Sequence, residues 1–427
     1  MSNGFSLLER SFSRFLSNFP HAKKIIKKCY VAVNYFLHRK SYEFKSDYTI
    51  KSIDIDEMET FFGYYDKCPD NGSGDVIVYA SPMSTRQVPD PLIPIKLYVY
   101  NIYSDSKKFI SDISSYNWQQ GSRAHWLSDD LLIYNCFSDE KSDYVSRVYS
   151  LKEERVISEY AFAVQDSYQS EYFLSINYTR LMALRPDYGY RNKDKISTTE
   201  LSNLSNDGIW SVDVKSGLGK LILTINDIVN FKFENHKDYQ HKINHVMISP
   251  DGEKFIFIHR YYINNKRVDR LLLSSKNGEL ISVLADNKMV SHCYWSCNDK
   301  IIGYLRSKDG VDSYWEININ DNSSYHLLDG ALRGYGDGHP SINNGFLITD
   351  TYPNKSRYQK LLLIDINNNS YVEIGEFFHG LSFSNESRCD LHPRFSHDGC
   401  MIFFDTVFSG KRKLCYLLLK DKSCGYV

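Results

Sequence analysis

Seven short segments of the chain centre on a histidine or a tyrosine, residue types that can carry acid–base or metal chemistry. The segments are Gly63-Tyr64-Tyr65-Asp66, Ala124-His125-Trp126, Asp187-Tyr188-Gly189-Tyr190, Asn244-His245-Val246, Ser291-His292-Cys293, Gly338-His339-Pro340 and Leu391-His392-Pro393. Imidazole titrates near neutral pH and binds divalent cations, and a phenol can donate a proton. Side chains of these types, brought together, would form one site that holds a cation and transfers protons.

The last three histidines favour a metal site. His292, His339 and His392 follow one another at nearly even intervals, and three imidazoles can share Mn or Zn at ligand distances of about 2.0–2.1 Å. An aspartate or Cys389 would be the fourth ligand. A single histidine at such a position more often hydrogen-bonds a neighbouring strand. Five at equivalent positions favour function, because neutral imidazoles clustered without partners cost desolvation energy.

The spacing of the seven segments, about 47 to 63 residues, is typical of a radial repeat. An apolar run accompanies each segment, at 76–80, 131–134, 181–184, 255–258, 301–305, 346–349 and 401–405. Second strand-like runs lie at 209–214, 269–273, 313–319, 360–366 and 413–419. Ser249-Pro250-Asp251-Gly252 supplies turn chemistry between such runs. We therefore predict an all-β chain, a seven-bladed β-propeller whose segments meet at one channel mouth.

The two ends of the propeller are expected to pair. The chain leaves little room for a fourth strand after the last segment, and the alternating stretch 48–55 is the natural donor. Pairing it with the last blade would remove an exposed sheet edge. One closed domain over 45–427 is therefore predicted.

The first 44 residues are predicted to be an amphipathic, basic helical extension. Phe12, Phe15 and Phe19 fall on one helical face, and Val33 and Phe36 continue an apolar stripe after the proline at position 20. Residues 1–40 carry eight Lys and Arg against one Glu, a combination suited to peripheral contact with an anionic inner-membrane surface. Packing of this helix against the propeller flank is the alternative.

Composition excludes several classes. The net charge of −1 over 427 residues argues against nucleic acid as the partner. The nine Cys show no regular framework, and the chain opens without a signal-peptide pattern, which predicts reduced thiols and a cytoplasmic location. No apolar run is long enough to span a membrane.

Several of these motifs resemble the propeller-type polysaccharide lyases, the group that contains oligogalacturonate lyase and the ulvan lyases. The resemblance covers about residues 55–420 and rests on Phe61-Phe62-Gly63-Tyr64-Tyr65-Asp66-Lys67, Trp118-Gln119-Gln120-Gly121, Arg185-Pro186-Asp187-Tyr188-Gly189-Tyr190, His245–Gly252 with Phe257-Ile258-His259-Arg260, Asp337-Gly338-His339-Pro340 and Arg388-Cys389-Asp390-Leu391-His392-Pro393. It implies a seven-bladed propeller that cleaves uronate-containing glycans by β-elimination in a canyon at the channel mouth, in some members with a divalent metal.

The resemblance also suggests roles for particular residues. His125 and Tyr188 would transfer protons, with His245 in the same catalytic group, and Arg191 or Arg260 would neutralise the uronate carboxylate. The candidate substrate contacts are Tyr65, Gln120, Tyr190, Trp126 and Arg388. Trp126 is alternatively a packing residue between blades, and Arg388 an ion-pair partner of Asp390. The closely spaced Gln and His ligands of oligogalacturonate lyase are absent here, which leaves its metal less clearly implied than its fold.

Two functions are therefore expected. The first is a lyase that acts on an acidic oligo- or polysaccharide. The second is a membrane-associated glycan-assembly protein, of capsule or O-antigen type, that binds or modifies such a glycan without lyase activity. A protein-interaction propeller is a third reading, weakened because the Trp-Asp repeat signal is absent.

Overall fold

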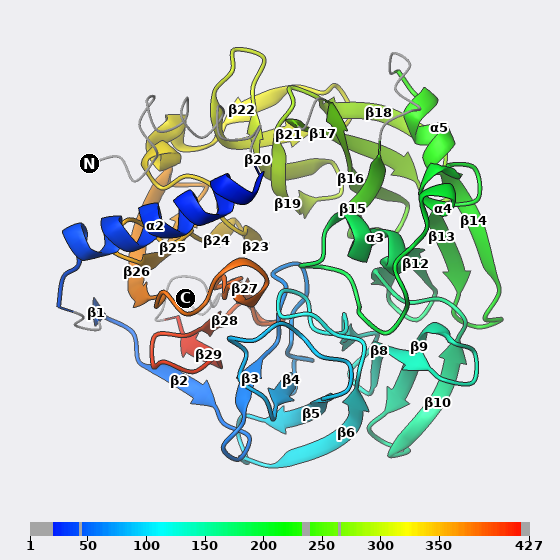
Figure 1. Ribbon diagram of the computed structural model, residues 1–427, viewed down its shortest axis with the longest axis horizontal. Coiled ribbons are helices and arrows are strands. Elements are labelled where there is room, and N and C mark those ends of the chain that lie inside the picture. Colours follow the sequence, from blue (N-terminus) through cyan, green and yellow to red (C-terminus); the bar gives the residue numbers. More distant parts are fainter. Residues whose placement is uncertain (1–19, 42–44, 233–239, 264–265, 420–427) are drawn as a thin grey trace.

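The computed structural model describes residues 20–41, 45–232, 240–263 and 266–419. Seven antiparallel sheets are arranged around a central axis, with each blade's first strand nearest that axis (Figure 1). The predicted seven-bladed β-propeller is confirmed. Helices are few and lie in insertions or before the first blade.

The first four blades each contain four consecutive strands. Blade 1 consists of β3 (Glu59–Phe61), β4 (Asp75–Ser81), β5 (Ile95–Asn101) and β6 (Lys107–Ile113). Blade 2 consists of β7 (His125–Trp126), β8 (Leu131–Ser138), β9 (Asp143–Ser150) and β10 (Arg155–Tyr160). Blade 3 consists of β11 (Asp166–Tyr168), β12 (Tyr172–Ile176), β13 (Gly208–Asp213) and β14 (Gly219–Thr224). Blade 4 consists of β15 (His241–Ile248), β16 (Lys254–Ile263), β17 (Lys266–Ser275) and β18 (Leu280–Ala285).

Blade 5 contains four consecutive strands, whereas blades 6 and 7 each gain a strand from the N-terminal part of the chain. Blade 5 consists of β19 (Val290–Cys297), β20 (Lys300–Arg306), β21 (Asp312–Asn318) and β22 (Ser324–His326), followed by the 3-10 helix η2 (Leu327–Gly334). Blade 6 consists of β23 (Ser341–Asn343), β24 (Phe346–Asp350), β25 (Tyr358–Asp365) and β26 (Ser370–Phe378), with β1 (Lys45–Ser46) paired on its outer edge. Blade 7 consists of β27 (Arg394–Phe395), β28 (Met401–Thr406) and β29 (Lys413–Leu418), preceded by the 3-10 helix η3 (Asn385–Ser387).

The N-terminal strand closes the ring. β2 (Ile50–Ile53) is the outermost strand of blade 7 and pairs with β29, from Ile50 opposite Leu417 to Ile53 opposite Leu414. The first and last blades are also joined near the axis, where Asp405 accepts hydrogen bonds from the backbone of Phe62 and Gly63. The predicted pairing of stretch 48–55 with the last blade is confirmed.

Turns predicted from sequence occur where the strands reverse. The amide of Gly252 donates to the carbonyl of Ser249 at 2.9 Å, and Gly252 adopts a φ of 74°. Glycine enters this left-handed conformation without the steric penalty that a side chain would cause. The Ser249 hydroxyl also donates to Asp251, which fixes the turn between β15 and β16.

Blade 3 departs from the predicted pattern. Run 181–184 is not a strand but belongs to helix α3 (Tyr178–Leu184), which Asn177 caps by accepting from the amides of Thr179 and Arg180. Helix α4 (Thr198–Ser202) follows, and α5 (Ile225–Asn230) comes after β14. Residues 177–207 therefore form an insertion between β12 and β13, and Tyr188 lies in this insertion rather than on an innermost strand.

Helix α2 (Pro20–His38) lies across blade 6 (Figure 1). The Tyr35 ring is 6.1 Å from that of Phe378, and Ser356 donates to the carbonyl of His38. The helix thus packs on the propeller, while Val33, Phe36 and Leu37 stay 54 to 75% exposed. The first predicted helix, before position 20, falls outside the described residues. No helix in the described ranges is both long and apolar enough to cross a bilayer.

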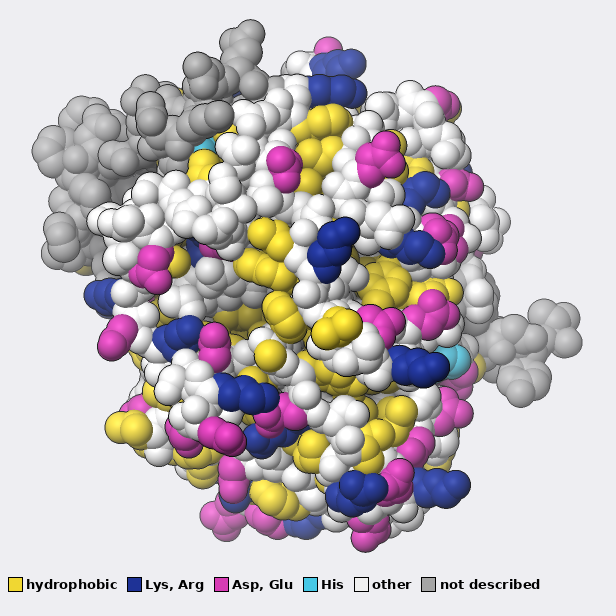
Figure 2. Space-filling view, turned by 90° about the vertical axis from the view of Figure 1, so that its right-hand side faces the viewer, with side chains coloured by type: hydrophobic (Ala, Val, Ile, Leu, Met, Phe, Trp, Pro, Cys, Tyr) yellow, Lys and Arg dark blue, Asp and Glu magenta, His cyan; other side chains and the backbone are white. Residues whose placement is uncertain are grey.

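Two features bear on what composition predicted, namely the distribution of charged side chains and the state of the cysteines. Figure 2 shows acidic and basic side chains interspersed on the side of the ring it presents. Seven of the cysteines in the described ranges are free thiols. Cys400 is disulfide-bonded, so the expectation that every thiol is reduced is wrong for this residue.

Candidate functional site

Four histidines from consecutive blades meet near the axis. The ring centroids of His292 and His339 are 4.1 Å apart, those of His339 and His392 are 4.3 Å apart, and those of His245 and His292 are 5.5 Å apart. All four are at most 6% exposed. The sequence segments of blades 4 to 7 therefore converge as predicted, and they form a buried imidazole cluster.

Tyr64 of blade 1 completes this cluster. Its hydroxyl lies 2.8 Å from Nδ1 of His245 and 3.5 Å from the hydroxyl of Tyr188. Its ring also lies 5.0 Å from that of His392. Residues from blades 1, 3, 4 and 7 thus surround one point, and a continuous polar contact runs from His245 through Tyr64 to Tyr188.

Three of the described residues place donor atoms close enough to hold a cation. The donor atoms of His339, Asp390 and His392 all lie within 4.8 Å of one another. Nε2 of His392 is buried without a hydrogen-bond partner, an arrangement that leaves its lone pair available. Two imidazoles and a carboxylate are ligands suited to Mn or Zn, so the residues present fit a divalent metal.

This group differs from the predicted triad in one member. His292 lies beside His339, but its Nδ1 is 3.3 Å from Asp337 Oδ1, and it is not among the three clustered donors. Asp390 supplies the carboxylate instead. Cys389, the other predicted fourth ligand, points its thiol towards the carbonyl of Asp390.

Asp350 orients the two histidines of the donor group. Its Oδ1 lies 2.8 Å from Nδ1 of His339 and accepts from the backbone amide of the same residue, while its Oδ2 accepts from the amide of His392. A proton on Nδ1 of His339 leaves Nε2 as the lone-pair nitrogen. A carboxylate behind a histidine in this way fixes the tautomer of a metal ligand.

Burial decides the charge state of most of the cluster. It lowers the pKa of His245 and His392 well below the usual value and that of His292 to about 4. Burial also opposes the charge on His339, but the Asp350 carboxylate outweighs it and raises the His339 pKa. His245 is therefore a neutral imidazole at neutral pH, the form that accepts a proton.

Two of the histidines adopt a strained backbone. The φ angle is 52° at His245 and 44° at His392, a region that bulky residues rarely occupy. His245 also lies at a β-bulge between Asn244 and Met247. Strain of this kind costs about 1–3 kcal/mol and gathers at functional sites.

Two arginines flank the cluster on the side open to solvent. Arg388 pairs with Asp390 at 2.6 Å and lies 5.2 Å from the Tyr352 ring centroid. Arg185 lies 4.9 Å from the Tyr188 ring centroid. Both side chains are 25% exposed, unlike the imidazoles below them. Although burial opposes ionisation, Arg388 holds the pKa of Asp390 below its usual range. These cations are placed to meet an anionic ligand.

The predicted carboxylate-binding arginines have other partners. Arg260 is 3% exposed and lies 2.9 Å from Asp269 within blade 4. Arg191 pairs with Glu386, which lies within η3. Arg260 is therefore buried within the blade, whereas Arg388 and Arg185, which pair with Asp390 and Asp187, keep 25% of their side chains exposed beside the cluster.

His125 is placed differently from the other histidines. Its Nδ1 lies 2.8 Å from the carbonyl of Arg123 and its Nε2 lies 2.7 Å from the hydroxyl of Ser167. Both nitrogens are thus engaged between blades 2 and 3. Tyr188 contacts Tyr64 and His245 instead.

Most of the predicted substrate contacts serve packing. Tyr65 is fully buried and donates to the carbonyl of Cys293, and Tyr190 stacks on Tyr178 at 4.5 Å. Trp126 donates from its indole nitrogen to the carbonyl of Pro69. Gln120 borders a small cavity beside Tyr64, and its side-chain oxygen is buried without a partner. Tyr65 nonetheless lies against the cluster, with its ring centroid 5.6 Å from that of His292, and Arg388 pairs with Asp390 of the donor group.

Sequence reasoning passed over three residues of the site. Tyr64 stands in the same segment as the chosen Tyr65, and neither type nor spacing separates the two. Asp390 and Arg185 both lie within motifs that were noted. The signal for Asp390 was its place two residues before His392, which brings a carboxylate onto the approach to an innermost strand.

Comparison with known proteins shows likeness of fold. No protein-family model matches the sequence, and no curated protein matches it. Oligogalacturonate lyase from Vibrio parahaemolyticus superposes with a TM-score of 0.59 and 11% identity, over 89% of this chain and 97% of that one. An oligogalacturonate lyase in complex with manganese gives 0.59 and 12%, over 90% and 97%. At such identity the likeness establishes the propeller architecture alone.

Proposed function

We propose that this chain is a polysaccharide lyase-like enzyme that cleaves a uronate-containing glycan by β-elimination at the channel mouth. The observation that carries the proposal is the meeting of three features at one point. A donor group of His339, Asp390 and His392 lies beside the Arg388 cation and beside the contact between Tyr64 and His245. The likeness of fold to a lyase in complex with manganese supports it.

Beta-elimination needs these groups because the C5 proton of a uronate is weakly acidic. Neutralising the C6 carboxylate stabilises the charge that develops when that proton leaves. Arg388 and Arg185 bind and orient the carboxylate from the solvent side. A divalent metal, when bound by His339, Asp390 and His392, would supply Lewis-acid stabilisation of the same carboxylate.

His245 and Tyr188 are assigned the proton transfers. His245 takes the C5 proton, the C4–O4 bond breaks as the C4–C5 double bond forms, and Tyr188 protonates O4. Tyr64 lies in contact with both residues. The proton on His245 can therefore return through Tyr64 to the Tyr188 phenolate, which restores the starting state.

The nature of the product tests this proposal. Elimination adds no water and leaves an unsaturated uronate, whereas hydrolysis adds one water to each cleaved bond. Mass spectrometry after incubation with polygalacturonate, ulvan, alginate and glucuronan distinguishes the two. We expect unsaturated oligosaccharides from at least one polymer. Hydrolysed products, or binding of a polymer without cleavage, would contradict the lyase assignment.

A second function has one specific observation in its favour. Helix α2 leaves Val33, Phe36 and Leu37 exposed beside Arg39 and Lys40, and an enzyme that degrades free glycans has no need of such a face. The alternative is a membrane-associated glycan-assembly protein that binds an acidic glycan at the same mouth without cleaving it. Binding without cleavage in the product assay would favour this alternative.

A further inference from the structure

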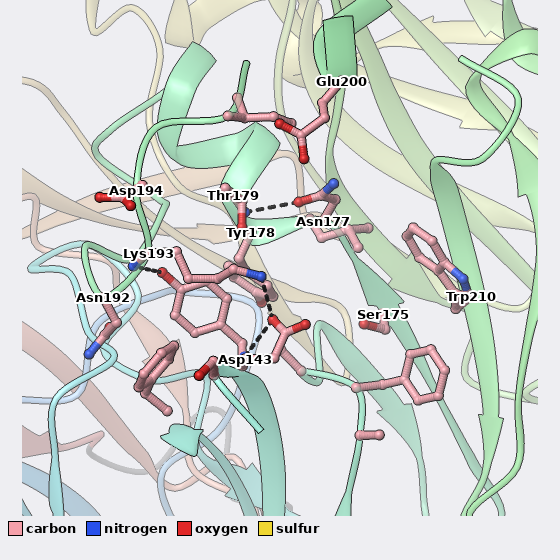
Figure 3. A pocket seen from close by; sticks show the side chains of 18 of the residues that line it. Asp143, Ser175, Asn177, Tyr178, Thr179, Asn192, Lys193, Asp194, Glu200 and Trp210 are labelled. Atoms are coloured by element: carbon pink, nitrogen blue, oxygen red, sulfur yellow. Dashed lines mark hydrogen bonds and ion pairs between the residues drawn. The ribbon is translucent and has the colours of Figure 1, made fainter. Parts of the chain in front are cut away.

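A cavity of about 720 Å³ lies between blades 2 and 3, away from the histidine cluster (Figure 3). Its walls come from β8, β9, β12 and β13, from the start of α3, and from residues 192–196. The volume falls within the range of roughly 300–1,000 Å³ that is usual for small-molecule sites. Neither the donor group nor the flanking arginines border it.

Small side chains explain why this space is open. Ser175 and Trp210 are directly paired across β12 and β13 and so stand on the same face of the sheet. The next pair on that face, Phe173 and Val212, fills the interface with blade 2 as part of a hydrophobic cluster. Ala161 and Ala163 also line the cavity, and their side chains are too short to fill it.

The segment that covers the cavity is fixed in place. Asn192 donates to Ser114 and accepts from Ser115, and the ammonium of Lys193 donates to Asp143 at 3.0 Å. Ser197 and Glu200 form a capping box at the start of α4. The cavity is therefore pre-formed, and a ligand would bind without having to order this loop.

The lining combines an aromatic face with polar groups of both signs. Trp210 is half-buried and stands beside Ser175, opposite the Lys193–Asp143 pair (Figure 3). Ser175 is 3% exposed and borders the cavity. Asp194, Glu200 and Lys195 add charges of both signs. An indole stacks on the apolar face of a sugar ring, while paired charges and hydroxyls bind its hydroxyl groups.

We propose that this cavity is a second glycan site, which binds an uncharged, hydroxyl-rich sugar unit. The mixed charges of its lining contrast with the arginines at the mouth, so it would not select an anion. Tyr178 forms the wall on the inner side, with its ring stacked on Tyr190. Tyr188 lies two residues before Tyr190 in the same insertion, and its hydroxyl contacts that of Tyr64. The insertion therefore borders both sites, and one glycan chain could occupy the two.

Saturation-transfer NMR on the full chain tests the site, with cellobiose and N,N′-diacetylchitobiose as neutral probes and trigalacturonate as the acidic probe. We expect at least one neutral probe to show transfer to its ring protons. Trp210→Ala should weaken that binding roughly tenfold, since the stacking face is lost, and Ser175→Leu should block it by filling the cavity. Trp315→Ala, which removes a half-buried tryptophan of blade 5, should leave it unchanged.

A second comparison separates this inference from the proposed function. Arg388→Ala should weaken the binding of trigalacturonate and leave the neutral probe bound. Trp210→Ala should weaken the binding of the neutral probe and leave trigalacturonate bound. A wild-type protein that binds neither neutral probe overturns the second site, whatever the result with trigalacturonate. Retention of neutral binding in both Trp210→Ala and Ser175→Leu, with the fold intact by circular dichroism, overturns it as well.

Discussion

At the scale of single residues, Nε2 of His392 is buried without a hydrogen-bond partner and could bind a ligand. A buried polar atom without a hydrogen bond is costly, and this one lies beside Asp390 and His339 at a strained backbone position. The carboxylate of Asp350 contacts the imidazole of His339 and accepts from the backbone amide of His392, so the group is already arranged before any ligand arrives. A pre-arranged donor set of this kind is what a divalent cation requires.

Metal content should therefore depend on these three side chains. We expect purified protein to carry close to one equivalent of Mn or Zn, and His339→Ala or Asp390→Asn to lose it, since ligand loss exceeds the about tenfold to hundredfold effect of residues behind the ligands. Mass-spectrometric metal analysis after dialysis measures this. His125→Gln is the matched control and should retain the metal. Equal metal content in His339→Ala and wild type would contradict the donor assignment.

Lys242 provides a pH test on stability. Burial, with Arg260 and Arg185 nearby, lowers its pKa from 10.5 to about 7. The unfolded chain therefore binds one proton more than the folded chain between about pH 7 and pH 10.5. In that window the penalty for a buried charge is progressively relieved, so this group makes stability rise with pH, by at most about 1.4 kcal/mol per pH unit.

Replacing this lysine should remove that contribution. Lys242→Met should be more stable than wild type below pH 7, and the difference should shrink as the pH rises towards 10. Urea unfolding at several pH values measures it, and the difference between the two proteins isolates Lys242 from other titrating groups. A constant difference across this range would show that Lys242 is not a buried, neutralised amine.

Residue types and spacing predicted that the segments of blades 4 to 7 converge, but they wrongly included His125 of blade 2, whose ring nitrogens contact Arg123 and Ser167. They also did not predict which side chain of each segment faces inward. Tyr64 and Tyr65 are adjacent, yet the hydroxyl of Tyr64 reaches His245 while that of Tyr65 bonds a backbone carbonyl. Likewise Arg260 was predicted to bind the uronate carboxylate, but it pairs with Asp269 on the neighbouring strand. Such choices depend on contacts between distant segments, which a single sequence does not display.

At the level of elements, period and turn residues predicted most strands, and blade 3 shows the limit. The run 181–184 is apolar and short, a pattern that fits a strand or a buried helix equally. The segment forms a helix, which Asn177 caps at its N-terminus and which buries Leu181. The insertion between β12 and β13 brings Tyr188 into contact with Tyr64 and His245.

Helix α2 remains predicted to contact membranes. It packs on blade 6 through Tyr35 and leaves an apolar stripe that includes Val33, Phe36 and Leu37 exposed. Apolar side chains flanked by Lys and Arg suit the surface of an anionic bilayer. We expect the protein to float with vesicles that contain phosphatidylserine and to remain unbound with phosphatidylcholine alone.

The matched control for this helix is an equally exposed leucine elsewhere. Leu37 and Leu218 are both 75% exposed. Leu37→Asp should reduce flotation several-fold, because a charge replaces an inserting side chain, while Leu218→Asp should not. Equal flotation of the two variants would assign α2 a purely structural role on the propeller.

At the scale of the whole molecule, we expect ring closure to stabilise the folded propeller. β2 supplies the outer strand of blade 7, and Asp405 ties that blade to the backbone of Phe62 and Gly63. Deleting residues 1–40 should leave a cooperative unfolding transition, whereas deleting 1–58 should expose the edge of β29 and cause aggregation. Light scattering during thermal unfolding distinguishes the two. Equal behaviour of the truncations would remove closure as the stabilising feature.

The rate of unsaturated-uronate formation, followed by ultraviolet absorbance with an acidic glycan that the protein cleaves, tests the central claim most directly. The account predicts activity in the wild type and a loss of about 10²- to 10⁴-fold in Tyr188→Phe, which keeps the ring and removes the proton donor. His125→Gln should retain activity, since His125 is engaged elsewhere. Full activity in Tyr188→Phe, or no unsaturated product from any acidic glycan bound at the mouth, would contradict it.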